Sequence, residues 1–213
     1  MADDILEYWL ALAREIGAKL NIEEFDTSSE MWSWDNFGEA IGTLRNRLGI
    51  GEVKVDILGY EVDLKTGETY DRLRNQSANP SKLIPHLYYY TKAKDEGISG
   101  EWVKFNSLSG SWACRFSYDE QDVNALAEAF SKDSAKAAEA MKKIGATPAD
   151  YGDMAFEISF LPMVKVLLVY EDADEEFPAS VRLLYDKNSI YYLPHEMLGN
   201  ISWILVSRVF AAV

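Results

Sequence analysis

The chain has little cysteine and little histidine. Its 213 residues include one cysteine, Cys114, and two histidines, His86 and His195. One thiol cannot form an internal disulfide. Together with two distant imidazoles it also falls short of the ligand set of a structural zinc site, and alone it cannot supply the thiolates of an iron–sulfur cluster. The composition therefore excludes disulfide scaffolds, ordinary zinc modules and self-contained iron–sulfur proteins.

Basic residues are also scarce. The sequence holds 21 Lys and Arg against 35 Asp and Glu, which gives a formal net charge of −14. A nucleic-acid backbone or an anionic lipid surface would be repelled by such a chain rather than attracted to it. We therefore expect neither a nucleic acid nor a membrane as a partner.

The two ends of the sequence lack targeting and membrane-spanning signals. The start, MADDILEYWLALAREIG, has acids where a secretory signal needs basic residues. The apolar stretch MLGNISWILVSRVFAAV is shorter than the ~20 residues of a membrane span, and it carries Asn200, Ser202 and Arg208. We expect a cytoplasmic protein with a buried C-terminal helix that begins near Leu193, where Pro194 suits the first turn.

Catalytic fingerprints are absent as well. The sequence contains no G-x-S-x-G nucleophile elbow, no G-x-x-x-x-G-K-[ST] phosphate loop and no G-x-G-x-x-G dinucleotide motif. Sequence motifs therefore identify no reaction and no cofactor, and whether the protein is an enzyme stays open.

The sequence does have enough apolar residues for one sizeable core, because 48% are hydrophobic and 13% aromatic. Apolar periodicity predicts helices and strands in separate blocks, not in strict β-α-β alternation. We therefore predict a single α+β domain over residues 1–213, with a helical N-terminal part (1–50), a mostly antiparallel sheet and a C-terminal helix packed on the sheet. The predicted helices are 5–20, 37–48, the run from Pro80, 119–144 and the C-terminal helix; the predicted strands are a meander from Glu52, 101–105, 111–118, Met154–Phe160, Val164–Tyr170 and Ser180–Tyr185.

The strand Val164–Tyr170 is apolar on both faces, as expected of a strand in the interior of a sheet. We predict that it lies next to Ser180–Tyr185, with a turn between them. Phe177, which stands between charged and apolar segments, is predicted to be buried in the core, with Pro178 beginning the return strand.

The connection between these two strands is acidic. It holds five carboxylates, those of Glu171, Asp172, Asp174, Glu175 and Glu176. Several carboxylates at one place can bind Ca²⁺ or Mg²⁺, but no EF-hand loop pattern is present, and a turn between strands is a natural place for solvated charge. We interpret the run as a solvated turn and keep a divalent-cation site at Asp174 and Glu176 as the alternative.

The C-terminal third carries a recognisable pattern. An apolar strand ends at Tyr170; Asp174-Glu175-Glu176-Phe177-Pro178, Leu184-Tyr185-Asp186 and Tyr192-Leu193-Pro194 with Glu196 follow. This pattern resembles the C-terminal signature of an uncharacterised bacterial and archaeal family, domain of unknown function 3786. That signature has Trp and Gly where this chain has Tyr170 and Ala173. The resemblance extends over residues 52–210.

The resemblance implies a link to anaerobic metabolism. Some members of the family are joined to cysteine-rich segments that resemble the iron–sulfur segments of corrinoid-dependent one-carbon enzymes. Because this chain has only Cys114, any such cofactor would belong to a partner protein.

The pattern and the chemistry of its residues define a candidate functional cluster. Its members are Asp174, Glu175, Glu176, Asp186, Tyr192, His195 and Glu196. Asp186 has an ordinary alternative as a turn cap, and Glu196 has one as a partner of the helix dipole. If the strands form a hairpin, the acids 174–176 and Asp186 lie at opposite ends of strand 180–185, and they need not form one site.

The two histidines are the side chains with unperturbed pKa values suited to proton transfer near neutrality. We expect His86, which lies among apolar and aromatic residues on a predicted helix, to be a hydrogen-bonded core imidazole. We expect His195, near a helix N-terminus, to be a neutral acceptor because the helix dipole disfavours its charged form.

Aromatic residues form the remaining signal. Those between 88 and 118 are Tyr88, Tyr89, Tyr90, Trp102, Phe105, Trp112, Phe116 and Tyr118. They could line a pocket for a flat ligand such as a tetrapyrrole, but we expect most of them in the core. Met31, Trp32 and Trp34 lie in a polar segment and are predicted to dock onto a partner or onto another part of this chain.

Three functions stay open. The first is an accessory binding module of anaerobic metabolism that docks to a metallo-enzyme or to a corrinoid or iron–sulfur carrier. The second is an enzyme or cofactor-handling protein that uses carboxylates, with a possible divalent cation. The third is a structural homo-oligomer.

Overall fold

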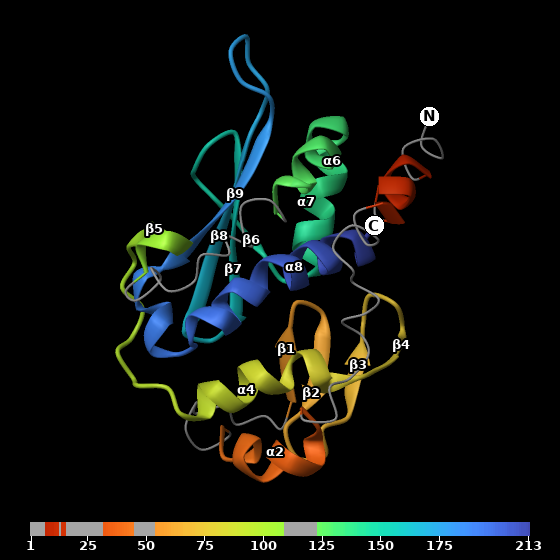
Figure 1. The fold of residues 1–213 in the computed structure, drawn as a ribbon. Helices are drawn as coiled ribbons and strands as arrows, with labels where there is room; N and C mark the ends of the chain where they lie inside the picture. Colours follow the sequence, from red (N-terminus) through yellow and green to blue (C-terminus); the bar gives the residue numbers. More distant parts are fainter. Residues whose placement is uncertain (1–6, 13, 16–31, 45–53, 109–122) are drawn as a thin grey trace.

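Two antiparallel sheets with helices around them form the part of the chain that the computed structural model describes (Figure 1). That part comprises residues 7–12, 14–15, 32–44, 54–108 and 123–213. The predicted α+β class is confirmed, although the strands form two sheets instead of one. Residues 7–12 and 14–15 are helical, as expected. The rest of the predicted helix 5–20, the end of 37–48 and the predicted strand 111–118 lie outside the described residues.

The smaller sheet is the predicted meander. Its strands follow one another in the order β1 (Lys54–Ile57), β2 (Tyr60–Asp63), β3 (Thr69–Asp71) and β4 (Gln76–Ala78). Two helices, α2 (Trp34–Gly42) and α4 (Ile84–Thr91), contact each other beside it (Figure 1). A 3-10 turn, Pro80–Lys82, leads into α4 and is capped by the Asn79 side chain.

The larger sheet has the order β5-β9-β8-β7-β6. Its strands are β5 (Trp102–Lys104), β6 (Thr147–Ala149), β7 (Met154–Leu161), β8 (Val164–Glu171) and β9 (Ser180–Asp186). The prediction that Val164–Tyr170 is an interior strand beside Ser180–Tyr185 is confirmed. The short edge strand β6 was not predicted, because Pro148 argues against a strand except at a sheet edge.

The predicted helical segment 119–144 is interrupted in its described part: residues 123–124 are helical, and α6 (Leu126–Lys132) and α7 (Ser134–Lys143) follow as separate helices. The break between α6 and α7 falls at Asp133, whose carboxylate accepts a hydrogen bond from the backbone N–H of Lys136 at 2.9 Å. An N-cap residue has a non-helical backbone, as Asp133 has here (φ −156°, ψ 87°), so the preceding helix ends where the new one is capped.

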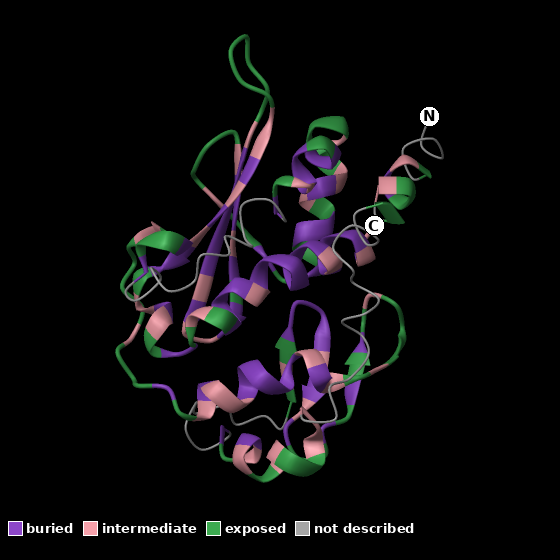
Figure 2. Cartoon of the chain, viewed as in Figure 1, coloured by how far each residue is buried: buried purple, intermediate pink, exposed green. Residues whose placement is uncertain are grey.

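The C-terminal helix, α8 (His195–Ala211), passes between the two sheets (Figure 1). It begins two residues after the predicted start, with Pro194 at its N-cap. Most of the helix is buried (Figure 2), because the sheets and neighbouring helices cover it from several sides. The prediction of a buried C-terminal helix is thus confirmed. No helix in the described ranges is long and apolar enough to cross a membrane.

A buried ion pair joins α8 to the meander. The guanidinium of Arg208 donates two hydrogen bonds to the carboxylate of Asp71 on β3, at 2.7 and 2.6 Å, and both side chains are 1% exposed. Arg208 Nε also donates to the carbonyl of Leu58 at 2.9 Å, and the guanidinium lies 3.7 Å from the centre of the Tyr60 ring. Burial alone would raise the pKa of Asp71, but the hydrogen bonds and charge of Arg208 hold this pKa below its usual value.

We predict that Arg208→Met lowers the free energy of unfolding by about 3–5 kcal/mol, because the buried Asp71 carboxylate loses both of its hydrogen bonds to the Arg208 guanidinium. Among the described residues, only Arg74, which is half-exposed and 3.9 Å away, then remains as a basic partner. The double variant Asp71→Asn with Arg208→Met should recover part of this loss. Urea unfolding measures both. Arg182→Gln breaks an exposed ion pair with Glu171 and, as a control, should cost at most about 1 kcal/mol. Equal losses in the single and double variants would contradict the prediction.

Candidate functional site

The β8–β9 hairpin extends well beyond the rest of the larger sheet (Figure 1). The last paired residues are Glu171 and Ser180, so residues 172–179 form the projecting tip. Asp174 organises this tip, because its carboxylate accepts hydrogen bonds from the backbone N–H groups of Glu176 and Phe177 at 2.8 and 2.7 Å. These bonds hold the pKa of Asp174 below its usual value. The acidic run is therefore a strand-connecting turn, as predicted.

The predicted burial of Phe177 is wrong. Its side chain is 66% exposed. The turn at Asp174 brings the Phe177 carbonyl within 3.0 Å of the Asp174 N–H, so the chain reverses beyond the last strand pair. No helix or strand among the described residues covers this tip (Figure 2). Pro178 lies in the connection, and the return strand begins at Ser180.

The base of the tip is fixed to the body of the molecule. The Tyr170 hydroxyl donates to the Asp172 carboxylate at 2.9 Å and lies 2.9 Å from the Ser131 hydroxyl on α6. The Asp172 N–H donates to the Asp153 carboxylate at 2.8 Å. Burial raises the pKa of Tyr170, whereas the hydrogen bond from Tyr170 lowers that of Asp172. The strand end, α6 and the loop before β7 are thus tied together.

An open hollow of about 810 Å³ lies at this base. It is lined by Gly152, Asp153, Glu171, Asp172, Ala173, Asp174, Phe177, Pro178 and Ser180. Gly152 has a φ of +55°, and a Cβ there would come within 2.8 Å of Val169 and 2.9 Å of the Tyr170 carbonyl. Only glycine lets the 150–153 loop lie this close to β8.

Asp186 and Tyr192 are engaged in holding the segment 94–101. The Asp186 carboxylate is 1% exposed and accepts four hydrogen bonds, from the Ser99 N–H and hydroxyl and from the N–H groups of Gly100 and Asn188, at 2.7–3.1 Å. The Tyr192 hydroxyl accepts from the N–H groups of Glu96 and Gly97 at 3.1 and 2.7 Å. These two side chains clamp 94–101 against the end of β9. The hydrogen bond from Asn188 is the turn cap that was the ordinary alternative for Asp186.

His195 and Glu196 lie in the first turn of α8. Glu196 is exposed, where its charge favours the helix N-terminus. His195 is half-buried, its ring is 6.0 Å from that of Phe105 in an edge contact, and its Nε2 is buried without a hydrogen-bond partner.

The predicted cluster therefore divides between the two ends of β9. Asp174, Glu175 and Glu176 lie at the hairpin tip, whereas Asp186, Tyr192, His195 and Glu196 lie at or beyond the opposite end. Within the part of the chain that the structure describes, no group of three or more His, Cys, Asp or Glu side chains could hold a metal ion. The carboxylates do not form one catalytic centre.

His86 is buried between α4 and α8. Its Nδ1 lies 3.0 Å from the carbonyl of Lys82, and its Nε2 lies 3.0 Å from the carbonyl of Met197. Burial lowers the pKa of this imidazole to about 4, although the two carbonyls favour the charged form. This is the hydrogen-bonded core histidine that we expected.

The described members of the two aromatic groups singled out in the sequence, residues 32–34 and 88–105, are buried or half-buried. Trp32 contacts Phe37, Tyr88 and Tyr89, with ring centres 4.8–6.1 Å apart. The Trp34 ring lies against Gly67, where a Cβ would overlap it. Of the two predicted roles, docking onto another part of this chain accounts for both tryptophans. Met31, Cys114, Trp112, Phe116 and Tyr118 lie outside the described residues.

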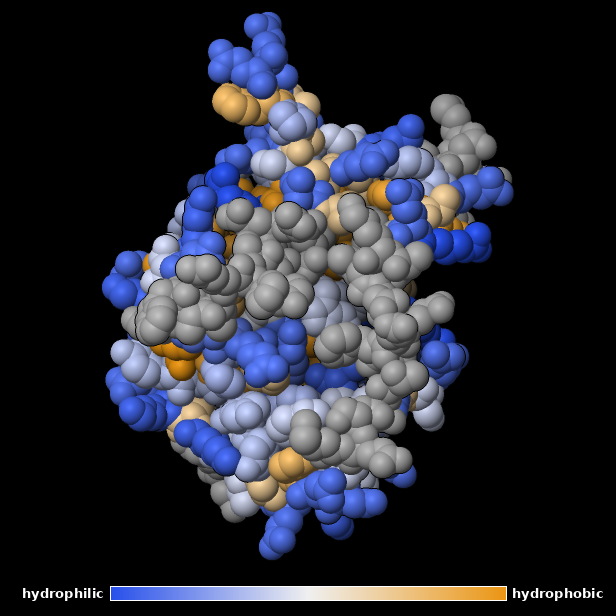
Figure 3. Space-filling view, viewed as in Figure 1, coloured by the Kyte–Doolittle hydropathy of each residue, from blue (hydrophilic) through white to orange (hydrophobic). Residues whose placement is uncertain are grey.

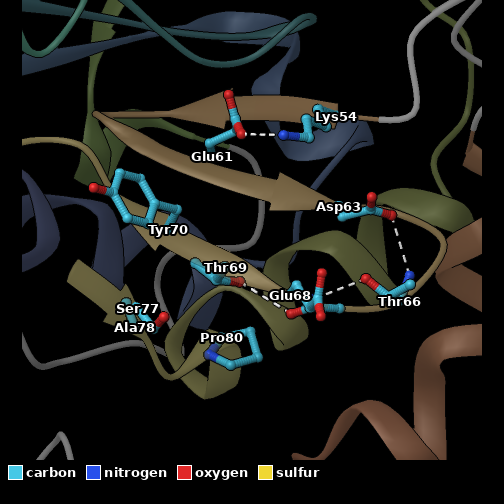
Figure 4. A pocket seen from close by; sticks show the side chains of 11 residues that line it. Lys54, Glu61, Asp63, Thr66, Glu68, Thr69, Tyr70, Ser77, Ala78 and Pro80 are labelled. Atoms are coloured by element: carbon cyan, nitrogen blue, oxygen red, sulfur yellow. Dashed lines mark hydrogen bonds and ion pairs between the residues drawn. The ribbon is translucent and has the colours of Figure 1, made fainter. Parts of the chain in front are cut away.

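A second hollow, of about 610 Å³, lies on the outer face of the meander (Figure 4). Its charged groups are engaged locally. Lys54 pairs with Glu61, and the Asp63 carboxylate accepts hydrogen bonds from the N–H groups of Lys65 and Thr66 at 2.7 and 3.1 Å. Among the described residues, no buried side-chain atom that lacks a hydrogen-bond partner lines this hollow. Because its charged groups already have local partners, we interpret this hollow as the surface of a strand face and a turn, not as a binding site.

Comparison with known proteins gives one match. The profile of the family described as "Domain of unknown function (DUF3786)" matches residues 43–208, more than half of the chain. The chain belongs to the DUF3786 family. Searches of curated proteins and of solved structures found no match.

The signature that suggested DUF3786 has a structural explanation at each end of β9. Asp174 builds the hairpin turn, and Asp186 with Tyr192 holds the segment 94–101. Where the family signature has Trp, Tyr170 uses its hydroxyl to bind Ser131 and Asp172. Sequence reasoning missed Asp153, because nothing in its local sequence indicates that it lies beside the hairpin.

We predict that Asp186→Asn destabilises the protein by about 2–3 kcal/mol, because an amide NH₂ would replace an acceptor that faces N–H donors. The effect should concentrate on the segment 94–101. Hydrogen exchange of the Ser99 and Gly100 amides, which bind Asp186, should accelerate. Glu196→Gln is the control and should leave both amides protected. Unchanged exchange in Asp186→Asn would refute the clamp.

We also predict that stability falls on acidification between pH 6.5 and about 4, the ordinary and the folded-state pKa of His86. In this window the unfolded chain binds a proton at His86 that the folded chain excludes. Neutral His86 therefore contributes about 3 kcal/mol to the free energy of unfolding above pH 6.5, and this contribution is lost by about pH 4. Urea unfolding from pH 7.5 to 4 measures the slope. His86→Gln should flatten it, and a slope that survives in His86→Gln would contradict this assignment.

Proposed function

We propose that the protein is an accessory binding module whose β8–β9 hairpin tip docks onto another protein. The observation that carries this proposal is Phe177, an aromatic side chain that is 66% exposed at the end of a projecting hairpin. Large exposed aromatic side chains often supply the dominant contacts of protein interfaces. An isolated exposed apolar residue needs no explanation, but this one stands at the outermost part of the fold.

Hydrogen bonds and an ion pair hold the hairpin tip in one conformation. Asp174 fixes the turn, Asp172 joins it to Asp153, and Arg182 forms a two-point ion pair with Glu171 at 2.9 and 2.6 Å across β8 and β9. A tip held in this way loses little conformational entropy when it binds. The exposed Phe177 ring is therefore presented by a rigid support.

For the partner, we propose a cytoplasmic metallo-enzyme, or a corrinoid or iron–sulfur carrier, of anaerobic metabolism. The support is the family resemblance described above and the single cysteine, which leaves cluster ligation to another chain. Carboxylate-based catalysis has less support, because the Asp186 carboxylate is already occupied by four hydrogen bonds and lies at the other end of β9 from Asp174.

We predict that Phe177→Ser abolishes capture of the partner while it changes the free energy of unfolding by at most about 0.5 kcal/mol, because the side chain is exposed. The measurement is anaerobic purification of tagged protein from the native host, followed by identification of co-eluting chains and absorption spectroscopy of the complex. Ile98→Ser is the matched control, since Ile98 is 48% exposed elsewhere.

Equal capture by both variants and the wild type would refute docking through the tip. A stable dimer of this chain with no partner retained, detected by sedimentation, would support a homo-oligomer instead. If the isolated chain carried a stoichiometric iron–sulfur spectrum, the assignment of the cofactor to the partner would be wrong.

A further inference from the structure

We infer that the hollow at the base of the hairpin receives a segment of the partner that carries lysine or arginine beside an apolar side chain. This inference rests on the proposed docking function and adds the chemistry of the partner. The basic side chains would enter the hollow, and the apolar side chain would pack against Phe177.

The charged residues that line the hollow are all acidic. Four of its lining residues are acidic, namely Asp153, Glu171, Asp172 and Asp174, and its lining includes no Lys, Arg or His. The nearby Arg182 is already paired with Glu171. Glu175 and Glu176 add two exposed carboxylates at the tip. A basic segment would neutralise this charge, and complementary charge at an interface favours both rapid association and selection among partners.

The hollow is apolar as well as acidic. Phe177 and Pro178 line it together with the carboxylates, and Tyr151, 49% exposed, is next to the lining residue Gly152. Figure 3 shows hydrophobic surface directly beside the hydrophilic surface of the projecting tip. A bare cation would leave the apolar part unused. A segment with both kinds of side chain matches the whole surface, because its basic groups meet the carboxylates and its apolar side chain meets Phe177.

The carboxylates also suit basic side chains better than a metal. Asp172 and Asp174 already accept hydrogen bonds, from the Tyr170 hydroxyl and from backbone N–H groups respectively, so they are fixed in place with lone pairs to spare. In the described part of the chain they do not converge with other acids into a metal-binding group. Guanidinium and ammonium groups can bind carboxylates that are spread over a surface, one at a time.

The test uses three fluorescein-labelled peptides of ten residues and fluorescence anisotropy with the full chain. The first peptide has a central leucine flanked by lysine and arginine, the second has the same leucine flanked by glutamine, and the third has a central serine flanked by the basic residues. We expect the first to bind most tightly and its affinity to fall as salt is raised from 50 to 300 mM, because exposed charges are screened.

Two double variants, each of which removes two negative charges, distinguish binding of the peptide at the hollow from general electrostatic attraction to the acidic protein. Glu175→Gln with Glu176→Gln removes two tip carboxylates whose side chains make no contact in the turn, and should weaken the first peptide about fivefold. Glu68→Gln with Glu139→Gln removes two carboxylates, one on the meander and one on α7, that do not line the hollow, and should leave the affinity unchanged. Phe177→Ser should weaken the first peptide about thirtyfold and the serine peptide much less.

Equal weakening by the two double variants, or equal affinity for the glutamine peptide, would overturn the inference. So would a rise in melting temperature on adding 1 mM Ca²⁺ that the Glu175→Gln and Glu176→Gln variant abolishes, because the hollow would then be a cation site. If Phe177→Ser abolishes partner capture but the tip double variant captures the partner fully at every salt concentration, docking stands and the basic partner is refuted. If Phe177→Ser has no effect on capture, the proposed function itself fails.

Discussion

The buried ion pair between Arg208 and Asp71 is the constraint on which the arrangement of the two sheets depends. α8 passes between the sheets, and its apolar residues can pack against many neighbours without fixing its rotation or depth. A buried arginine allows far less freedom, because each unpaired donor would be costly. Arg208 is satisfied by a carboxylate on β3, a carbonyl at Leu58 and the ring of Tyr60, all from the meander. One position of α8 relative to the smaller sheet satisfies all three.

Several aspartate side chains of this acidic protein accept hydrogen bonds from its own backbone N–H groups. Aspartates accept backbone N–H groups at a turn of the meander (Asp63), at the start of α7 (Asp133), at the hairpin tip (Asp174) and at the clamp on segment 94–101 (Asp186). At the first three positions aspartate is suited because its short side chain reaches N–H groups two or three residues away. Asp186 binds the N–H of Asn188 in the same way and also reaches Ser99 and Gly100, which the fold brings beside it. These carboxylates are fixed in place by their hydrogen bonds. The exposed acids beside Phe177 are different, since Glu175 and Glu176 have no such task, and this difference leads us to place binding at the tip.

The sequence could predict the elements whose burial follows a simple period. β8 reads as apolar on both faces and is the central strand, and the hairpin with β9 follows from the acidic turn between them. Partners distant in sequence could not be predicted in the same way. Asp153 lies next to Asp172, and Asp186 holds residues 94–101, because the fold brings these segments together. One signal was available, since a single arginine within the apolar C-terminal helix requires a buried partner, but nothing in the sequence identifies Asp71 as that partner.

The wrong prediction for Phe177 has the most bearing on function. The prediction followed the general tendency of phenylalanine to be buried, applied to a residue between a charged and an apolar segment. This tendency held for Phe156 and Phe160 in β7, which are 2% and 0% exposed. It fails at Phe177 because Asp174 closes a tight turn that carries the ring beyond the last strand pair. The Phe177 side chain contributes little to the core because it is exposed, so a polar residue would fit the same turn at no cost to the core. An apolar ring that the fold presents without burying is best explained by a contact outside the chain, because departures from local consistency concentrate where a protein performs its function.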